Sequence, residues 1–181
     1  DYIDLGFGNT ITPTDYNFTI NFWIQIENNI IQSNNLFGAE SNEMFIRFFN
    51  LTDSQICFDI RDYSYNRLTI CDNELATELN KNNWNLITVT KSGNTADDLK
   101  FYLNNRLLNT FVQTNNLVFN IQPLGFNFFL GSQNSIGTPS GFTNAKYDDF
   151  KFYSRDLSES EILHLYQNYS PPTNIQGNYT N

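Results

Sequence analysis

The sequence has few of the side chains that enzymes commonly use for chemistry. Its 181 residues include one histidine, His164, and two cysteines, Cys57 and Cys71. Nothing in the sequence places a serine or a cysteine within reach of His164, which argues against a catalytic triad of the Ser-His-Asp type. Two cysteines without further ligands are too few for a structural zinc site. A glycine-rich loop followed by Lys and Ser or Thr, which would hold a phosphate, is also missing.

Basic residues are scarce as well. The chain has 10 Lys and Arg against 19 Asp and Glu, a formal net charge of −9. Binding to nucleic acid or to an anionic membrane depends on clustered Lys and Arg, and here the basic residues are scattered. The sequence has no run of 18 apolar residues, so we predict no membrane insertion.

Asparagine and aromatic residues are abundant instead. The chain has 29 Asn, 17 Phe and 10 Tyr. This aromatic content is far above that of intrinsically disordered sequences. We assign the asparagines to the surface and to loops. The length suits a single domain, predicted over residues 1–169. Residues 170–181 contain two prolines and no periodic apolar pattern, and they are predicted to be a linker or tail.

Alternating apolar residues predict strands through most of the chain. In Phe18–Glu27 every second side chain is apolar, as in a strand with one buried face. Trp23 is the exception on the polar face. It either packs against a neighbouring element or provides a platform on which a sugar stacks. Short apolar segments separated by turn residues follow and predict an antiparallel meander.

Near the C-terminus a strand pattern changes into a helix pattern. Tyr147–Tyr153 alternates, with Phe150 and Phe152 on one face. Ser158 and Glu161 then have the spacing of a capping box, and apolar residues at helical spacing follow. The sequence therefore predicts one strand leading into one short helix.

The pattern of Gln55–Asp72 predicts the register of a hairpin. A three-residue loop puts Phe58 opposite Ile70 and Cys57 opposite Cys71, whereas a two-residue loop would scatter the apolar residues over both faces. Facing Cβ atoms in paired strands are about 4.5–5.5 Å apart, close to the about 3.5–4.5 Å of a disulfide. We predict a Cys57–Cys71 disulfide if the protein is exported, with two free thiols as the alternative in a reducing cytosol.

Other segments have weaker patterns. Asn73–Lys81 has helical spacing and is predicted to form a helical turn. Leu99–Leu103 and Arg106–Val112 are predicted to form a hairpin around Asn104-Asn105. The glycines and the proline of Ser132–Gly141 predict the longest irregular loop before the closing strand.

Three stretches together resemble one known family. They are the closing DDFKFYSRDLSESEILHLY, the opening DYIDLG with NFTINFWIQIE, and the central NNWNLITVTKSGNTADDLKFYLNNRLL. All three resemble parts of concanavalin A-like lectin jelly rolls, especially laminin-G-like and pentraxin-like modules. The resemblance implies an all-β fold, a two-sheet antiparallel jelly-roll β-sandwich with one short C-terminal helix. Because Asp1 lies where such modules have already begun their first strand, we expect the chain to be a piece of a larger protein.

This resemblance implies a function of recognition. Similar modules include lectins, adhesion modules, glycanases and toxin subdomains. We expect a non-catalytic module that binds carbohydrate on a cell or virion surface. Its partners would be a glycan or glycoprotein and the neighbouring domains of a larger chain, and it would be secreted or exposed on a cell or virion.

Two alternatives stay open. WNLITVT with the hairpin FYLNNRLL is also similar to the jelly-roll subdomain in the receptor-binding regions of clostridial neurotoxins. That similarity implies a structural subdomain with no ligand of its own. The other alternative is a glycanase, which this superfold includes, but its E-x-D-x-x-E strand is missing here and no catalytic residue is assigned.

Ligand binding is expected at loops, because the inner sheet faces of a sandwich are occupied by packing. Sugars need aromatic faces for their C–H surfaces and amide or carboxylate groups for their hydroxyls. Two loops offer that mixture, the tip of the first hairpin and the long loop before the closing strand. The candidate residues are Asp62, Tyr63, Tyr65, Asn66, Gln133, Asn134 and Phe142. Ordinary turn chemistry also explains the tip, and the sheet face around Trp23 is the next candidate.

Asp148 and Asp149 are the candidate metal ligands. They are adjacent hard oxygen donors, and the resemblance implies a structural Ca²⁺ held by such an aspartate. The alternative is that they accept backbone N–H groups or pair with Arg155.

Overall fold

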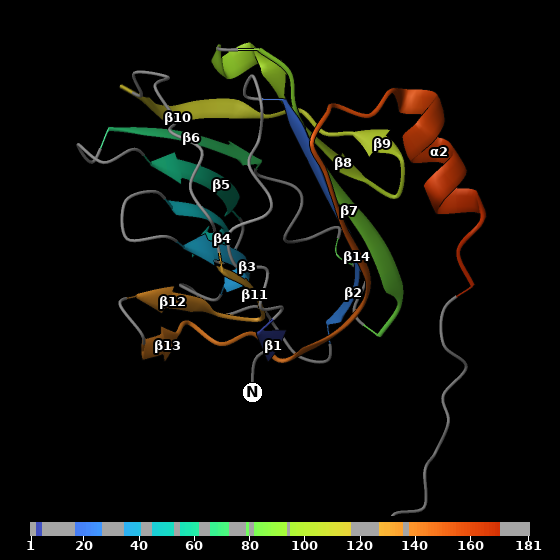
Figure 1. Ribbon diagram of the computed structural model, residues 1–181, viewed down its shortest axis with the longest axis horizontal. Helices are drawn as coiled ribbons and strands as arrows, with labels where there is room; N and C mark the ends of the chain where they lie inside the picture. The colour runs from blue at the N-terminus through green and yellow to red at the C-terminus, as the bar shows by residue number, and fades with distance from the viewer. Residues whose placement is uncertain are drawn as a thin grey trace, which may run out of the picture.

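In the part of the chain that it describes, the computed structural model is an antiparallel β-sandwich with two main sheets as its layers and one α-helix outside them, as the sequence predicts (Figure 1). It describes residues 3–4, 17–26, 35–40, 45–52, 55–61, 66–72, 79, 82–93, 95–116, 127–135 and 138–170. Within these residues no helix is long and apolar enough to cross a membrane.

One layer is a seven-stranded sheet with the order β1-β11-β3-β4-β5-β6-β10. Its strands are β1 Ile3–Asp4, β3 Asn35–Glu40, β4 Phe45–Thr52, β5 Gln55–Arg61, β6 Arg67–Asp72, β10 Phe111–Asn115 and β11 Asn127–Leu130. A two-stranded sheet of β12 Gln133–Ser135 and β13 Thr138–Ser140 follows β11 along the chain.

The other layer is a five-stranded sheet with the order β14-β2-β7-β8-β9. Its strands are β2 Phe18–Ile26, β7 Trp84–Lys91, β8 Leu99–Leu103, β9 Arg106–Leu107 and β14 Ala145–Tyr153. A short 3₁₀ helix, Ala96–Asp98, precedes β8, and α2, Glu159–Gln167, follows β14. Figure 1 shows α2 on the outer side of this sheet.

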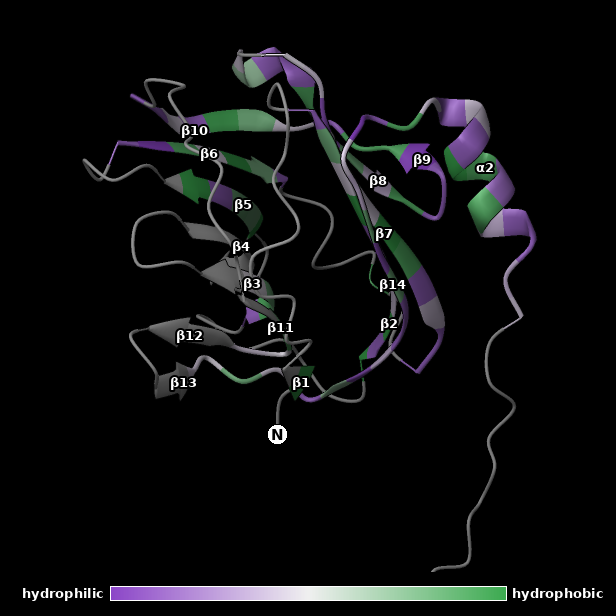
Figure 2. Cartoon of the chain, in the orientation of Figure 1, coloured by the Kyte–Doolittle hydropathy of each residue, from purple (hydrophilic) through white to green (hydrophobic). Residues whose placement is uncertain are grey.

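The core lies between the two sheets and is built from their alternating apolar residues. The hydrophobic segments of β5 and β7 stand out in Figure 2. β2 contributes its apolar face to the core, and β5 and β6 contribute theirs from the opposite layer. The largest fully buried apolar side chains are Phe22, Phe37, Phe58, Phe101, Ile20, Ile24 and Leu36.

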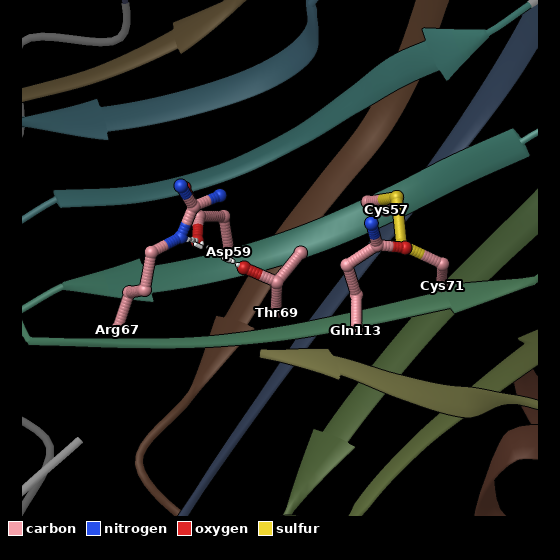
Figure 3. Close-up of a disulfide and its surroundings, with 6 residues drawn as sticks. All are labelled: Cys57, Asp59, Arg67, Thr69, Cys71 and Gln113. Atoms are coloured by element: carbon pink, nitrogen blue, oxygen red, sulfur yellow. Dashed lines mark hydrogen bonds and ion pairs between the residues drawn. A yellow bond between two sulfur atoms is a disulfide. The ribbon is translucent and has the colours of Figure 1, made fainter. Parts of the chain in front are cut away.

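The predicted register of the β5–β6 hairpin is confirmed. Phe58 faces Ile70, and Cys57 faces Cys71. The two cysteines form the predicted disulfide, with an S–S distance of 2.07 Å (Figure 3). They are fully buried in a small cluster separate from the main core, because they lie on the opposite face of the strands from Phe58 and Ile70.

The closing strand β14 pairs with β2 and carries a bulge. The register shifts between Asp148 and Lys151, and Asp149 has a φ of 48°. A bulge inserts one extra residue and so moves the next side chains to the other face. As a result Tyr147, before the bulge, and Phe150, after it, both pack against the same core.

The predicted strand at Arg106–Val112 is wrong in its extent. Its start forms β9 beside β8, and the turn at Asn104-Asn105 has the positive φ values, 50° and 68°, of the predicted two-residue hairpin. Leu108 is buried in the core, which ends the strand, and the chain crosses to the other sheet as β10.

The prediction that Ser132–Gly141 is irregular is also wrong. β12 and β13 pair there, with Asn134 opposite Pro139. A two-stranded sheet tolerates proline because each strand has an unpaired edge, where no N–H is required. The helical turn predicted at Asn73–Lys81 lies, apart from Leu79, outside the described residues.

The predicted helix start is confirmed in α2. Ser158 and Glu161 form the capping box, and Arg155 pairs with Glu161 through two hydrogen bonds of 3.1 and 2.6 Å. Leu157 and Ile162 are buried against Tyr102 on the outer face of the five-stranded sheet. These contacts fix α2 on the sheet and set the position of the residues at its C-terminal end.

Candidate binding pocket

A pocket of about 620 Å³ opens where the C-terminal end of α2 meets the outer face of the five-stranded sheet. Among the residues that the structure describes, those lining it are all aromatic or asparagine. They are Trp23, Asn82, Asn83, Trp84, Asn85, Asn104, Tyr166 and Tyr169. The residues come from β2, from the start of β7, from the β8–β9 turn and from the helix end.

The inner wall is a stack of aromatic rings. Tyr169 lies on Trp23 with ring centroids 4.0 Å apart and an interplanar angle of 15°, and Tyr166 stacks on the same indole at 5.8 Å. Trp23 is only 5% exposed as a result, so it anchors the end of α2. The interpretation of Trp23 as a packing residue is therefore confirmed, and its ring is not an open platform.

Tyr169 is held in place by a hydrogen bond. Its hydroxyl donates to Asp148 Oδ2 at 2.7 Å. Burial, and then this carboxylate as acceptor and nearby negative charge, raise the pKa of Tyr169 above its usual value. The hydroxyl therefore stays protonated and keeps donating across the physiological pH range.

Aromatic surface remains accessible on the outer side of the pocket. Trp84 is half-buried, and its ring meets Tyr169 edge to face with centroids 6.5 Å apart and an angle of 68°. Tyr166 is 38% exposed. A ligand entering the pocket would thus meet the rings of Trp84 and Tyr166 before the buried indole of Trp23.

The asparagines form a rigid floor with an exposed rim. Asn104 Nδ2 donates to the buried Asn85 Oδ1 at 2.9 Å, and Asn104 Oδ1 accepts the backbone N–H of Leu86 at 2.8 Å. Asn82 has a φ of 66°, which asparagine tolerates better than most residues. The side chains of Asn82 and Asn83 are exposed, so each offers an amide donor and acceptor to the pocket.

A family comparison agrees with this fold. Residues 1–163 match the family model described as the concanavalin A-like lectin/glucanases superfamily, of the laminin-G type. The chain belongs to this superfamily. The predicted family and jelly-roll fold are thereby confirmed, whereas the superfamily itself contains both binding modules and enzymes, as its name states.

Solved structures similar to the chain share the superfamily fold at low sequence identity. The binding domain of botulinum neurotoxin serotype D is 16% identical with a TM-score of 0.64, over 92% of this chain and 39% of that one. The serotype G binding domain is 17% identical with a TM-score of 0.60, over 92% and 44%. A heptameric SAP-like pentraxin from Limulus polyphemus is 14% identical with a TM-score of 0.59, over 88% and 73%.

The chain therefore spans less than half the length of the neurotoxin binding domains it matches. No curated protein sequence matches it significantly.

The structure describes only part of the ligand-binding loops predicted from the sequence. Asp62, Tyr63 and Tyr65 lie outside the described residues. Asn66 is half-buried just before β6, and Phe142, after β13, is 48% exposed.

Gln133 and Asn134 form part of β12. Three strands lie between β11, which leads into β12, and β6, so four inter-strand spacings of about 4.8 Å put them about 19 Å apart. The strands that carry the two parts of the predicted site are thus far apart, and the ligand role of these residues stays a prediction.

The two aspartates proposed as metal ligands already have protein partners. Asp148 Oδ1 accepts the backbone N–H of Asp149 at 2.8 Å, and its Oδ2 accepts from Tyr169. Asp149 pairs with Lys151 at 2.5 Å, and the expected alternative partner Arg155 binds Glu161 instead. No group of three His, Cys, Asp or Glu that could hold a metal occurs in the described part of the chain. The calcium site stays a prediction.

Sequence patterns did not reveal the pocket as a unit. They identified Trp23 on a polar face, but not its grouping with Trp84, Tyr166 and Tyr169. One signal was available, since a tryptophan on an outward face requires a cover and the predicted helix carries aromatic residues at its end.

Proposed function

We propose that the domain is a non-catalytic carbohydrate-recognition module and that the pocket beside α2 is its binding site. The observation that carries the proposal is the combination of accessible aromatic rings, Trp84 and Tyr166, with the exposed amides of Asn82 and Asn83. Aromatic faces suit the C–H surfaces of a sugar ring, and amides can both donate to and accept from its hydroxyls.

The size and charge of the pocket point to a small neutral glycan. A volume of about 620 Å³ lies within the usual range of small-ligand pockets, about 300–1,000 Å³. The described residues that line it carry no formal charge, so an acidic or basic sugar would lose hydration without gaining an ion pair with them. We expect one or two neutral sugar units to bind.

No carboxylate occurs among the described residues that line the pocket, which also supports a non-catalytic role. Glycoside hydrolysis normally needs two carboxyl groups about 5–9.5 Å apart across the scissile bond. Asp148 is in contact with the pocket wall, but its Oδ2 accepts the hydroxyl of Tyr169. Reducing-sugar release from common polysaccharides would contradict this part of the proposal.

The disulfide supports a location outside the reducing cytosol. A buried Cys57–Cys71 bridge is typical of secreted or surface-exposed domains. The glycan would then be carried by a cell, a virion or a secreted glycoprotein.

A structural role within a larger protein is the second candidate. It is favoured by the similarity to neurotoxin binding domains, of which this chain spans 39% in the serotype D case. In that role the domain would bind a neighbouring domain and no glycan.

A glycan array probed with the 181-residue chain tests the proposal. Any hit is then measured with Trp84→Ala and Tyr166→Ala, which should weaken binding at least about tenfold, or about 1.4 kcal/mol. Phe142→Ala is the matched control, because Phe142 is an exposed aromatic residue outside the pocket.

Each outcome of this experiment is informative. Loss of binding only in Phe142→Ala would move the ligand to the loop predicted from sequence. An array without any hit, together with tight binding to a flanking domain, would favour the structural role. Near-UV circular dichroism of each variant checks that the fold is intact.

A further inference from the structure

Asp148 lies beside Trp23 on the outer face of the five-stranded sheet. The two residues are Cα partners where β14 pairs with β2. Side chains directly opposite each other in an antiparallel pair point to the same face, with Cβ atoms about 4.5–5.5 Å apart. The carboxylate is therefore next to the indole that forms the inner wall of the aromatic pocket.

Tyr169 contacts both of these residues at once. Its ring stacks on Trp23 with centroids 4.0 Å apart, and its hydroxyl donates to Asp148 Oδ2 at 2.7 Å. The same ring meets Trp84 edge to face. One hydrogen bond thus holds the ring that connects the two tryptophans of the pocket.

Tyr169 depends on these side-chain contacts because it follows the end of the helix. α2 ends at Gln167 and is capped by Asn168, whose N–H donates to His164 O at 3.1 Å. Stacked aromatic rings occur over a wide range of offsets, whereas a hydrogen bond to a charged acceptor is directional and stronger than a neutral one. The hydroxyl of Tyr169 therefore selects one position of the ring on Trp23.

The second oxygen of Asp148 is also in use. Oδ1 accepts the backbone N–H of Asp149 at 2.8 Å, at the bulge where Asp149 has a φ of 48°. Both partners of the carboxylate are donors, so this position needs two acceptor oxygens. An asparagine side chain has only one. Asparagine, the commonest choice in this chain, would therefore leave one of the two donors without its acceptor.

We propose that Asp148 is a positioning residue of the glycan site, acting through the hydroxyl of Tyr169. Asp148 is not among the described residues that line the pocket, so its effect on a ligand passes through the aromatic wall. The effect on binding rests on the proposed function of the pocket. The effect on the wall itself does not, and it can be measured without a ligand.

The first test is acrylamide quenching of tryptophan fluorescence. The chain has two tryptophans, so in a Trp84→Phe background only Trp23 emits. Trp23 is 5% exposed, and quenching should be weak. Asp148→Ala and Tyr169→Phe should each raise the quenching constant severalfold. Asp156→Asn, the control, removes an exposed carboxylate outside the pocket lining and should leave it unchanged.

The second test is a double-mutant cycle on the affinity for a glycan found on the array. Asp148→Ala and Tyr169→Phe should each weaken binding severalfold, and the double variant should lose no more than either single variant. Once the hydroxyl is gone, a residue that acts only through it has no further effect. EDTA in every sample removes any contribution from a metal ion, and near-UV circular dichroism checks the fold.

The acceptor count is tested by Asp148→Asn, which should also weaken binding. Wild-type affinity in Asp148→Asn would overturn the requirement for a carboxylate. Additive losses in the cycle would show that Asp148 acts through the bulge and would overturn the role of the Tyr169 hydroxyl.

The quenching result separates this proposal from the proposed function. Unchanged quenching in Asp148→Ala would overturn the positioning role whether or not a glycan binds. Raised quenching in Asp148→Ala, with no glycan bound by the wild type, would refute the glycan site and confirm that Asp148 positions the aromatic wall.

Discussion

Removal of the Cys57–Cys71 bridge should destabilise the domain by about 3 kcal/mol. The two residues are 14 positions apart, so the bridge closes a loop of 15 residues. In the loop-entropy model, a cross-link over a loop of this length restricts the unfolded chain by about 3 kcal/mol. The β5–β6 pairing that aligns the cysteines extends from Ile56 opposite Asp72 to Arg61 opposite Arg67. The folded hairpin should therefore persist without the bridge.

Urea unfolding, followed by tryptophan fluorescence and circular dichroism, measures this effect. The samples are oxidised wild type, reduced wild type and the double variant Cys57→Ala/Cys71→Ala. For a domain of this size about 3 kcal/mol corresponds to a decrease in Tm of about 6–12 °C. The urea m value should rise in the reduced protein, because its unfolded chain is less compact.

Reduced wild type separates the two contributions to the double variant. Reduction breaks the cross-link and keeps both sulfur atoms in the buried cluster, whereas the alanines also remove their volume. A difference below about 1 kcal/mol between oxidised and reduced wild type would refute the loop-entropy reasoning. Two alkylatable thiols in protein from an oxidising compartment would refute the bridge itself.

Three further predictions concern α2 and β14. Ile162→Ala should lower the free energy of unfolding by about 2–5 kcal/mol in urea melts, because Ile162 is fully buried, while Leu163→Ala at the exposed neighbour should change little. Hydrogen bonds from Arg155 lower the pKa of Glu161 from 4.5 to about 2, so its stabilising contribution is complete above pH 4.5 and is lost as the pH falls toward 2. NMR titration measures that pKa, and Glu161→Gln should flatten the acid limb of stability against pH. If the predicted calcium site exists, dialysed protein will contain Ca²⁺ that Asp148→Ala loses; metal-free protein with unchanged melting in excess Ca²⁺ would exclude it.

Local sequence patterns were sufficient to predict the structure where two independent patterns pointed to the same arrangement. In the β5–β6 hairpin, the alternation of apolar residues and the length of the turn allow one register, and this register put Cys57 opposite Cys71. The start of α2 was predicted for the same reason, because the capping box at Ser158 coincides with the onset of helical spacing.

Features that depend on contacts distant in sequence were not predicted. Leu108 ends β9 because the core between the sheets takes its side chain, and an apolar run alone does not show which sheet each half will join. The bulge at Asp149 could not be predicted either. Tyr147 and Phe150 are three positions apart, so in a regular strand they would point to opposite faces, and only packing brings both to the core face.

The candidate pocket is hidden for a related reason. Trp23, Trp84 and Tyr169 belong to three separate segments, and their rings meet only after α2 has docked on the sheet. No window of the sequence contains the site.

The pairing of β14 with β2 also determines the order in which the domain can be completed. Phe18–Ile26 needs Ala145–Tyr153 on one side, and the paired residues are 119 (Ile26 and Ala145) to 134 (Thr19 and Tyr153) positions apart in the chain. At about 5–20 residues per second, a ribosome takes about 6–24 s to make the intervening segment. During that interval one edge of β2 has no partner, and the apolar face of the strand lacks the closing aromatic residues of β14. Nascent Phe18–Ile26 therefore needs shielding, for example by a chaperone, until translation has passed Tyr153.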